Sequence, residues 1–275
     1  MILQSVYKEW EAGHGLLYTW FSAMHTRIDI ILCDQPEKEL KIIADKIYNE
    51  VNRIEKLASY YDISSDLYKL NNEASQTAIV IDKELFGMII DCIDYNKKTH
   101  GYFDIAVKSD NYNNNILSQL GLDKADTTIY YKAKGIHIDL SGYLKGYALD
   151  SIYKILETHQ ISNALINMGN SSVMAIGNHP HGKGWKVSYG HISETGSNQS
   201  INLYDECLTT SGNESRDRKH IINPSTGEYI EGVKRLSVIT QKGTEGEILS
   251  TAMFIADPYQ REEIARNFNI KYYET

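Results

Sequence analysis

Residues 16 to 33 read LLYTWFSAMHTRIDIILC, a run rich in β-branched and aromatic residues that is typical of β-structure. The stretch Ala23–Met24–His25 in its middle predicts a turn, so that the run folds as a hairpin. Asp34 and Pro36 then give a helix-start signal. From Leu40 to Leu57, apolar residues recur at steps of three and four, which predicts an amphipathic helix directly after the hairpin.

The rest of the chain groups its strands and helices in clusters instead of alternating them strictly. Helices are expected over 83–98, 143–159, 245–255 and 258–267, a polar loop over 108–115, and strands over 127–131, 135–140, 164–176, 184–189, 200–204, 236–240 and 270–273. This grouping favours an α+β fold with mixed or antiparallel sheets and flanking helices over a doubly wound sheet. Neither GxGxxG after a strand nor GxxxxGK[ST] occurs, so two standard nucleotide folds are not expected.

Length and composition limit the possible functions. The 275 residues fit one domain of two packed lobes, 1–275. With 36 acidic and 28 basic residues the net charge is −8, which argues against a nucleic-acid partner. The three cysteines are far apart and predict neither a disulfide framework nor a zinc site. No signal peptide, lipobox or membrane span is found, so the chain as written is expected to be cytoplasmic.

An acidic protein that handles a phosphorylated ligand needs a cation or well-placed N–H donors, and residues 137–147, HIDLSGYLKGY, offer both. A strand is expected to end at Leu140, Ser141 and Gly142 to form a turn, and a helix to follow. The free N–H groups of its first turn attract an anion, and Lys145 adds a positive charge nearby. The alternative is a plain strand–turn–helix with Lys145 in solvent.

A second segment combines TTSGN, residues 209–213, with HIINPSTG, residues 220–227. The first part is expected to be a polar loop and the second a strong turn. A short strand would aim His220 at whatever the loop surrounds, where its imidazole could take a proton from an incoming hydroxyl. By itself this segment favours the alternative, a structural turn with a satisfied histidine.

The third segment is EILST, residues 247–251. On a helix, Glu247 and Thr251 are four residues apart and share one face. A carboxylate, a hydroxyl and a nearby backbone carbonyl are hard oxygen ligands, which suit Mg²⁺ better than zinc. Taken alone, the segment favours an ordinary, half-exposed helix face.

In this order, the segments resemble the motifs of the FAD:protein FMN transferase family, also called the ApbE family. The resemblance runs from about Met24 to Ile255. It is carried by LASYYDISSDLYKLN at 57–71, GYFD at 101–104, DLSGYLKGYA at 139–148, NMGN at 167–170, Trp185, TSG at 210–212 and HIINPSTG at 220–227.

The resemblance implies an α+β protein of two lobes with a flavin nucleotide, FAD, as substrate in the cleft. The residues implied to contact the nucleotide are Met24, Tyr61, Tyr102, Phe103, Asp104, Asp139, Lys145, Thr210, Ser211, Gly212 and His220. Among these, Asp139 and Lys145 would hold ribose or phosphates, and His220 would stand near the reacting phosphate as the catalytic residue. The implied Mg²⁺ ligands are the carbonyl of Gly142 and the side chains of Glu247, Thr251 and Ser250.

The implied reaction is the Mg²⁺-dependent transfer of FMN from FAD to a threonine or serine hydroxyl of another protein, with release of AMP. Mg²⁺ and Lys145 would reduce the charge repulsion that keeps a hydroxyl from the diphosphate. Two alternatives stay open: a metal-dependent FAD pyrophosphatase that gives FMN and AMP, and a catalytically weak FAD-binding protein.

The chain departs from the family pattern at four positions. Glu247 replaces the metal-binding aspartate, Asn223 replaces the aspartate of D-P-x-T-G, and Ser141 and Leu144 replace a glycine and an alanine near the lysine. FAD binding is expected to survive these changes more readily than turnover. Members of the family are usually exported, whereas no leader is seen in this sequence.

Overall fold

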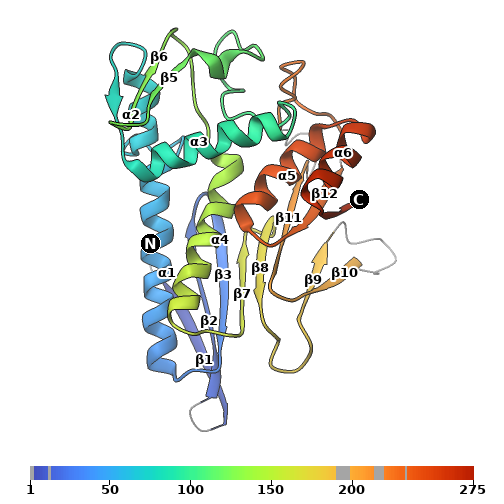
Figure 1. Cartoon of the computed structure of the whole chain (residues 1–275). Coiled ribbons are helices and arrows are strands. Elements are labelled where there is room, and N and C mark those ends of the chain that lie inside the picture. Colours follow the sequence, from blue (N-terminus) through green and yellow to red (C-terminus); the bar gives the residue numbers. More distant parts are fainter. Residues whose placement is uncertain (1–2, 12–13, 190–198, 214–219, 233) are drawn as a thin grey trace.

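The computed structural model describes residues 3–11, 14–189, 199–213, 220–232 and 234–275 (Figure 1). Its largest unit is an eight-stranded sheet in the order β1-β2-β3-β7-β8-β11-β12-β13, in which every neighbouring pair is antiparallel. The strands are β1 (Gln4–Glu11), β2 (His14–Ala23), β3 (Thr26–Cys33), β7 (Ala164–Met168), β8 (Ser172–Ile176), β11 (Glu206–Gly212), β12 (Arg235–Thr240) and β13 (Lys271–Glu274).

The predicted hairpin and the helix after it are confirmed. Met24 and His25 have φ of 50° and 57° and connect β2 to β3 as a two-residue turn whose twist matches the strands. The helix is α1 (Glu37–Ala58), which follows Pro36 and buries its apolar face against the sheet. Each large aliphatic side chain buried in this way stabilises the fold by roughly 1.5–3 kcal/mol.

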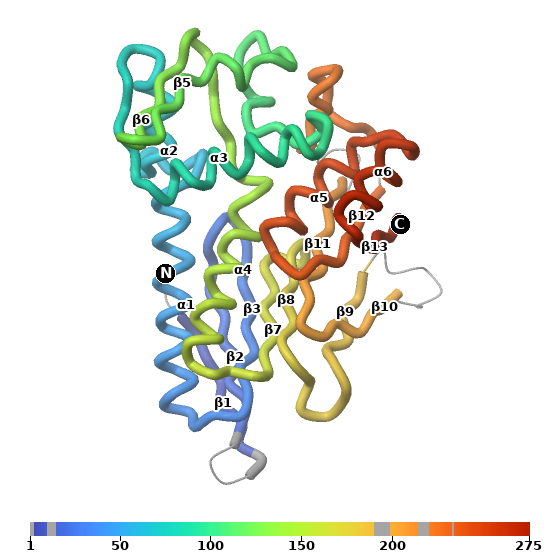
Figure 2. The backbone as a smooth tube through the Cα atoms, in the orientation of Figure 1, coloured from blue at the N-terminus to red at the C-terminus, as the bar shows by residue number. Residues whose placement is uncertain are grey.

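Four helices cover one face of the large sheet. Besides α1 they are α4 (Ser141–Thr158), α5 (Gly243–Ile255) and α6 (Pro258–Phe268). Figure 2 shows α1, α4 and α5 next to one another, and the packing of α1 on α4 and of α4 on α5 agrees with this view. On the opposite face, β9 (Trp185–Tyr189) and β10 (Gln199–Leu203) pair with each other, and Trp185 and Leu203 bury an apolar cluster there.

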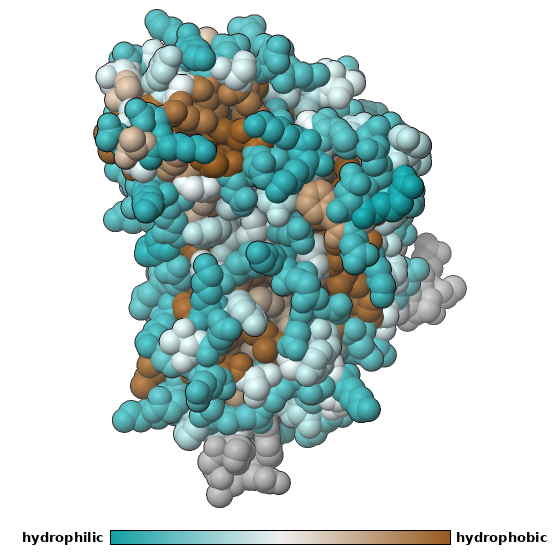
Figure 3. All heavy atoms as spheres, in the orientation of Figure 1, coloured by the Kyte–Doolittle hydropathy of each residue, from teal (hydrophilic) through white to brown (hydrophobic). Residues whose placement is uncertain are grey.

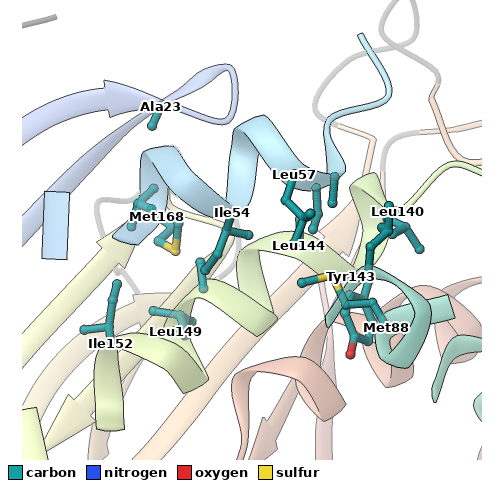
Figure 4. Packing of buried hydrophobic residues seen from close by; sticks show 14 of the residues in the cluster. Ala23, Ile54, Leu57, Met88, Leu140, Tyr143, Leu144, Leu149, Ile152 and Met168 are labelled. Atoms are coloured by element: carbon teal, nitrogen blue, oxygen red, sulfur yellow. The ribbon is translucent and has the colours of Figure 1, made fainter. Parts of the chain in front are cut away.

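A smaller part of the molecule contains a three-stranded sheet in the order β4-β6-β5. Its elements are α2 (Asp66–Glu73), β4 (Ile79–Val80), α3 (Lys83–Lys98), the 3₁₀ helix η1 (Ile116–Gln119), β5 (Leu120–Asp123) and β6 (Thr128–Tyr131). One hydrophobic cluster runs from this part into the large sheet and its helices. Figure 4 shows side chains of α1, α3 and α4 in that cluster, with Leu57 close to Leu144 and Met88 close to Tyr143.

Three local predictions are wrong. Residues 135–140 form no strand; instead, the buried amide of Asn71 accepts from Ile138 N and donates to Ile138 O, each at 2.8 Å. Residues 209–212 are not a loop but the end of β11, since their backbone pairs with β12. Ser141 and Gly142 do not form a turn before α4 but are its first two residues.

The predicted strand 164–176 is two strands, and β1, α2, β4 and β5 were not expected. The α+β class, with antiparallel sheets and flanking helices, is confirmed. Cys33, Cys92 and Cys207 are buried free thiols, as expected from their spacing. None of the described helices combines the length and apolarity needed to cross a membrane. Figure 3 shows a largely hydrophilic face with a large hydrophobic area near α3 and smaller hydrophobic areas elsewhere.

Candidate functional site

A cavity of about 980 Å³ lies where the smaller part of the molecule meets the helices of the large sheet. Its volume is at the upper end of the range of about 300–1,000 Å³ that is usual for small-molecule sites. All the sequence-predicted site residues except Ser250 line it: Met24, Tyr61, Tyr102, Phe103, Asp104, Asp139, Gly142, Lys145, Thr210, Ser211, Gly212, His220, Glu247 and Thr251. Segments far apart in the chain are therefore brought together in one place.

Lys145 and Glu247 form the polar floor of the cavity. The Lys145 Nζ lies 3.4 Å from Glu247 Oε1, and the Glu247 side chain is only 6% exposed. Lys145 also donates to the Ser171 hydroxyl, and the Ser172 hydroxyl donates to the same Glu247 oxygen. Lys145 is thus fixed against a carboxylate at the cavity, which excludes the alternative of a lysine in solvent.

A close contact between α4 and α5 makes this pairing possible. A Cβ atom on Gly146 would lie 2.2 Å from the carbonyl oxygen of Gly243, so no larger residue fits there at the observed helix separation. The Asp150 carboxylate of α4 accepts from Gly243 N at 2.7 Å and from Thr244 N at 3.1 Å. Those bonds satisfy two free N–H groups at the start of α5 and fix the helix that carries Glu247.

The proposed oxygen ligands gather on the adjacent wall. A Cβ on Gly142 would lie 3.9 Å from Thr251 Oγ1, and Ser211 Oγ lies 3.1 Å from the same hydroxyl. Glu247 and Thr251 both line the cavity from α5, as their spacing predicts. Ser250 is fully buried behind this wall, where its hydroxyl lies 2.8 Å from Ser211 Oγ and donates to Glu247 O at 3.2 Å.

Asp139 organises the start of α4. Its Oδ1 accepts from Ser141 N at 2.8 Å and from Ser141 Oγ at 2.5 Å, while Lys108 Nζ lies 2.6 Å from Oδ2. Its own N–H donates to Ile105 O at 2.7 Å, which ties the start of the helix to the loop after α3. Both oxygens of the Asp139 carboxylate therefore have partners beside the cavity.

The loop after α3 supplies an aromatic and acidic stretch of the wall. His100 and Gly101, with φ of 54° and 82°, turn the chain so that Tyr102, Phe103 and Asp104 reach the cavity. Asp104 is 9% exposed and accepts from Ala106 N at 2.7 Å. Burial raises the pKa of its carboxyl above the ordinary value, although that hydrogen bond partly offsets the effect.

The turn between β2 and β3 places Met24 at the cavity edge. Its backbone N–H donates to Glu55 Oε1 at 2.8 Å, so a side chain of α1 holds the turn in position. The next residue, His25, packs edge-on against Tyr61 with ring centres 5.3 Å apart. Tyr61 is 56% exposed and presents its ring to the cavity.

Glu55, Lys108 and Ser171 are among the polar lining residues that sequence reasoning missed. Glu55 occupies one position of an amphipathic helix rich in acidic residues, and Lys108 lies in the segment that was interpreted only as a polar loop. Ser171 lies in the turn between β7 and β8, inside a stretch that was expected to be continuous strand. Their partners are distant in sequence, so no local pattern marks them.

His220 lies at the exposed rim of the cavity. The short strand expected to aim it is absent from the described residues, since only a single bridge joins Ile222 to Tyr229. The turn at 223–227 is confirmed, with Gly227 N donating to Asn223 O at 2.8 Å. Among the described residues, no hydrogen bond of the imidazole is found.

Several known proteins are similar to this chain in sequence or in fold. A protein of Rhodobacter capsulatus named FAD:protein FMN transferase is 31% identical over 53% of this chain, a stretch that spans only 29% of that protein. A protein of the same name from Chlamydia trachomatis serovar D is 24% identical over 80% of this chain and 75% of its own length. The flavin transferase ApbE of Vibrio cholerae superposes with a TM-score of 0.82 at 18% identity, over 94% of this chain and 93% of that one.

The sequence pattern described as the ApbE family matches residues 24–273 of this chain. That range includes every element from the β2–β3 turn to β13, and with it all the residues that line the cavity. The match thus spans nearly the whole described fold, and the chain belongs to the ApbE family.

Proposed function

We propose that this protein is a Mg²⁺-dependent FAD:protein FMN transferase, which moves the FMN half of FAD to a threonine or serine hydroxyl of another protein and releases AMP. The observation that carries the proposal is the convergence of Lys145, the start of α4 and the oxygen atoms of Gly142, Glu247 and Thr251 at one cavity. Relatives named FAD:protein FMN transferase support it independently.

The residues present fit a magnesium ion. The donor set consists of hard oxygen atoms, which Mg²⁺ prefers. Within the described chain, both contacts of the Glu247 carboxylate use Oε1, which leaves Oε2 for a ligand. Gly142 O and the Thr251 hydroxyl would complete the protein's share, and bound Mg²⁺ would neutralise charge on the diphosphate and on departing AMP.

The chain's own residues would bind and orient the substrate. Lys145, fixed by Glu247 and Ser171, offers a positive charge to the diphosphate, and Gly142 N at the start of α4, which has no partner among the described residues, adds a donor. The aromatic residues Tyr61, Tyr102 and Phe103 would bind the flavin nucleotide on the other walls. Such fixed donors and walls lower the barrier mainly by positioning and by electrostatic stabilisation.

The acceptor hydroxyl would enter from outside, where His220 lies at the rim. The ring nitrogen of His220 would take the hydroxyl proton as the oxygen attacks the phosphorus of the FMN half. The bond between that phosphorus and the bridging oxygen then breaks, and the oxygen leaves with AMP. A buried histidine could not reach a protein substrate in this way.

Two specific observations support the two alternative functions, one each. The exposed rim at His220 would also admit water, which would make the protein an FAD pyrophosphatase. The contacts of Glu247 with Lys145 and Ser172 would compete with a metal ion, which would favour a weakly catalytic FAD-binding protein.

The deciding experiment is an incubation of the protein with FAD, Mg²⁺ and an acceptor peptide that carries a threonine. We expect a covalent yellow peptide adduct and an equal amount of AMP, measured by mass spectrometry and chromatography. Free FMN and AMP without any peptide would identify the pyrophosphatase instead. FAD that stays bound and intact for hours with Mg²⁺ present would identify the binding protein.

A further inference from the structure

Lys108 forms part of the cavity wall between the loop that follows α1 and the start of α4. Its Nζ lies 2.6 Å from Asp139 Oδ2 and donates a hydrogen bond of 3.0 Å to the Tyr61 hydroxyl. The same nitrogen lies 5.0 Å from the ring centre of Tyr60 and 5.3 Å from that of Tyr61. A cation is therefore held against one carboxylate and two aromatic rings, all of which line the cavity.

The ammonium stays charged and keeps one donor available. Burial alone would lower the pKa of Lys108, but attraction to Asp139 and the hydrogen bonds with Asp139 and Tyr61 raise it above the ordinary value. Of the three N–H donors of an ammonium, Asp139 and Tyr61 take two. The third has no partner among the residues that the structure describes, so it can bind an acceptor on a ligand in the cavity.

The surroundings of Lys108 suit a flat ring with acceptors along one edge. Tyr61 is 56% exposed, and His25 supports it edge-on at 5.3 Å, so its face can stack with an aromatic ligand. A ring stacked on Tyr61 brings an edge toward the ammonium, which lies only 5.3 Å from the ring centre of Tyr61. The isoalloxazine of a flavin is such a ring, and its pyrimidine edge carries two carbonyl oxygens.

We propose that Lys108 is a specificity-determining residue for the flavin half of the substrate, whose third N–H binds a carbonyl oxygen on the pyrimidine edge of the isoalloxazine. The inference rests on the proposed function, which supplies FAD as the ligand. Asp139 and Tyr61 position the ammonium, and the hydrogen bond that Asp139 accepts from Ser141 N fixes Asp139 relative to the start of α4. Lys145, which is paired with Glu247, would instead act on the diphosphate.

The test compares Lys108→Met, which removes the charge, with Lys108→Arg, which keeps it. Lys134→Met is the matched control, because Lys134 is an exposed lysine that does not line the cavity. The dissociation constant of riboflavin is measured by quenching of flavin fluorescence, and that of ADP by calorimetry. Riboflavin carries no phosphate, so its affinity reports the ring contact and not the field at the diphosphate.

We expect Lys108→Met to raise the riboflavin dissociation constant about tenfold, the effect of one charge-assisted hydrogen bond of about 1.4 kcal/mol. The riboflavin dissociation constant of Lys108→Arg should stay within about threefold of the wild-type value by the same reasoning, and that of Lys134→Met should match the wild-type value. The ADP dissociation constant should change much less than that of riboflavin in every variant. If Lys108→Met does not fold, Lys108→Gln, whose amide can still donate to Asp139, takes its place.

Unchanged riboflavin affinity in a folded, uncharged variant overturns the inference, and so does an equal loss of ADP affinity, which would place Lys108 at the start of α4 instead. The same wild-type preparation is assayed for transfer of FMN to the acceptor peptide. Transfer together with unchanged riboflavin affinity rejects the role of Lys108 and leaves the proposed function standing. A wild type that binds neither riboflavin nor FAD rejects both.

Discussion

Glu247 is the residue whose chemistry the proposed function needs most, because it supplies the only carboxylate of the proposed metal set. Replacing it by alanine (Glu247→Ala) should lower the rate of Mg²⁺-dependent transfer by more than about a hundredfold, since a catalytic metal contributes several kcal/mol of transition-state stabilisation. The rate is measured as AMP release with FAD and acceptor peptide. Lys145 would lose its ion-pair partner but keep its Ser171 contact, so FAD binding should persist.

The matched control is Glu157→Ala, which removes an exposed carboxylate from α4 outside the cavity. Circular dichroism should show an unchanged fold in both variants. Full activity of Glu247→Ala would contradict the proposed metal set.

Glu55 is expected to act through Met24 by holding the β2–β3 turn at the cavity edge. Its loss in Glu55→Ala should raise the KM for FAD by about five- to tenfold, the effect of one hydrogen bond from a backbone N–H to a charged group. Because Met24 is expected to contact the nucleotide and not the reacting atoms, kcat should change little.

Glu55→Gln is the matched control, since its amide oxygen can still accept from Met24 N. The KM of this variant should lie close to that of the wild type. A fall in kcat with an unchanged KM would show that the turn does not position the substrate.

The residues of the site differ in how far the sequence alone could identify them. Lys145 and Glu247 belong to segments whose residue types suit a phosphate and a hard cation, and the order of the motifs united them. The roles of Lys108 and Glu55 follow only from their contacts with Asp139, Tyr61 and Met24, which lie in other elements. Contacts of this kind depend on the tertiary structure, which leaves no periodic signal in the sequence.

Among the elements, residues 135–140 show how a side chain can replace a strand partner. The amide of Asn71 in α2 bonds both the N–H and the carbonyl of Ile138, and its oxygen accepts from the Tyr131 hydroxyl at 2.9 Å. Asn71→Ala should lower the free energy of unfolding by about 2–4 kcal/mol, because it leaves buried polar groups without partners. Urea denaturation followed by fluorescence measures the loss.

The neighbouring residue offers the control for this measurement. Asn72 is exposed, and its side-chain amide donates to Tyr68 O in its own helix, so Asn72→Ala should change the free energy of unfolding by no more than about 0.5 kcal/mol. Equal stability of the two variants would show that the Asn71 amide does not hold the segment that leads to Asp139.

Elements were predictable where the signal was local. The apolar stripe of α1, a helix of 22 residues, runs from Leu40 to Ala58, and tertiary packing agrees with it. The end of β11 has no such local signal, because its residues are polar although they lie inside the sheet. Thr209 is 1% exposed, and the Thr210 hydroxyl lies 2.7 Å from that of Ser237. The Thr210 hydroxyl is bonded to the neighbouring strand, whereas the buried Thr209 Oγ1 has no hydrogen-bond partner among the described residues; backbone pairing with β12 makes a strand of a sequence pattern that is typical of a loop.

At the scale of the molecule, clustered strands and helices predicted the α+β class but not the strand order. The order β3-β7-β8-β11 pairs β3 with β7, although four α-helices, a 3₁₀ helix and the three-stranded sheet lie between these two strands in sequence. Such pairings depend on which faces the whole chain can bury together, and a single sequence does not reveal them. The position of the cavity follows from that order, because the start of α4 and the Glu247 face of α5 meet above these strands.

The cavity walls come from segments spread between Met24 and Ile255, and one hydrophobic cluster joins the small sheet to the large one. We therefore expect the chain to unfold as one domain, in a single transition that ligands shift to higher temperature. FAD at about a hundred times its dissociation constant should add about 2.7 kcal/mol and raise Tm by roughly 5–10 °C, with a further gain from Mg²⁺. Calorimetric scans with and without each ligand measure the shift.

In Glu247→Ala the gain in stability from FAD should remain, whereas the additional gain from Mg²⁺ should vanish because the carboxylate of the proposed site is gone. Two separate transitions, only one of them moved by FAD, would contradict the single domain, and an Mg²⁺ gain that survives in Glu247→Ala would place the ion elsewhere.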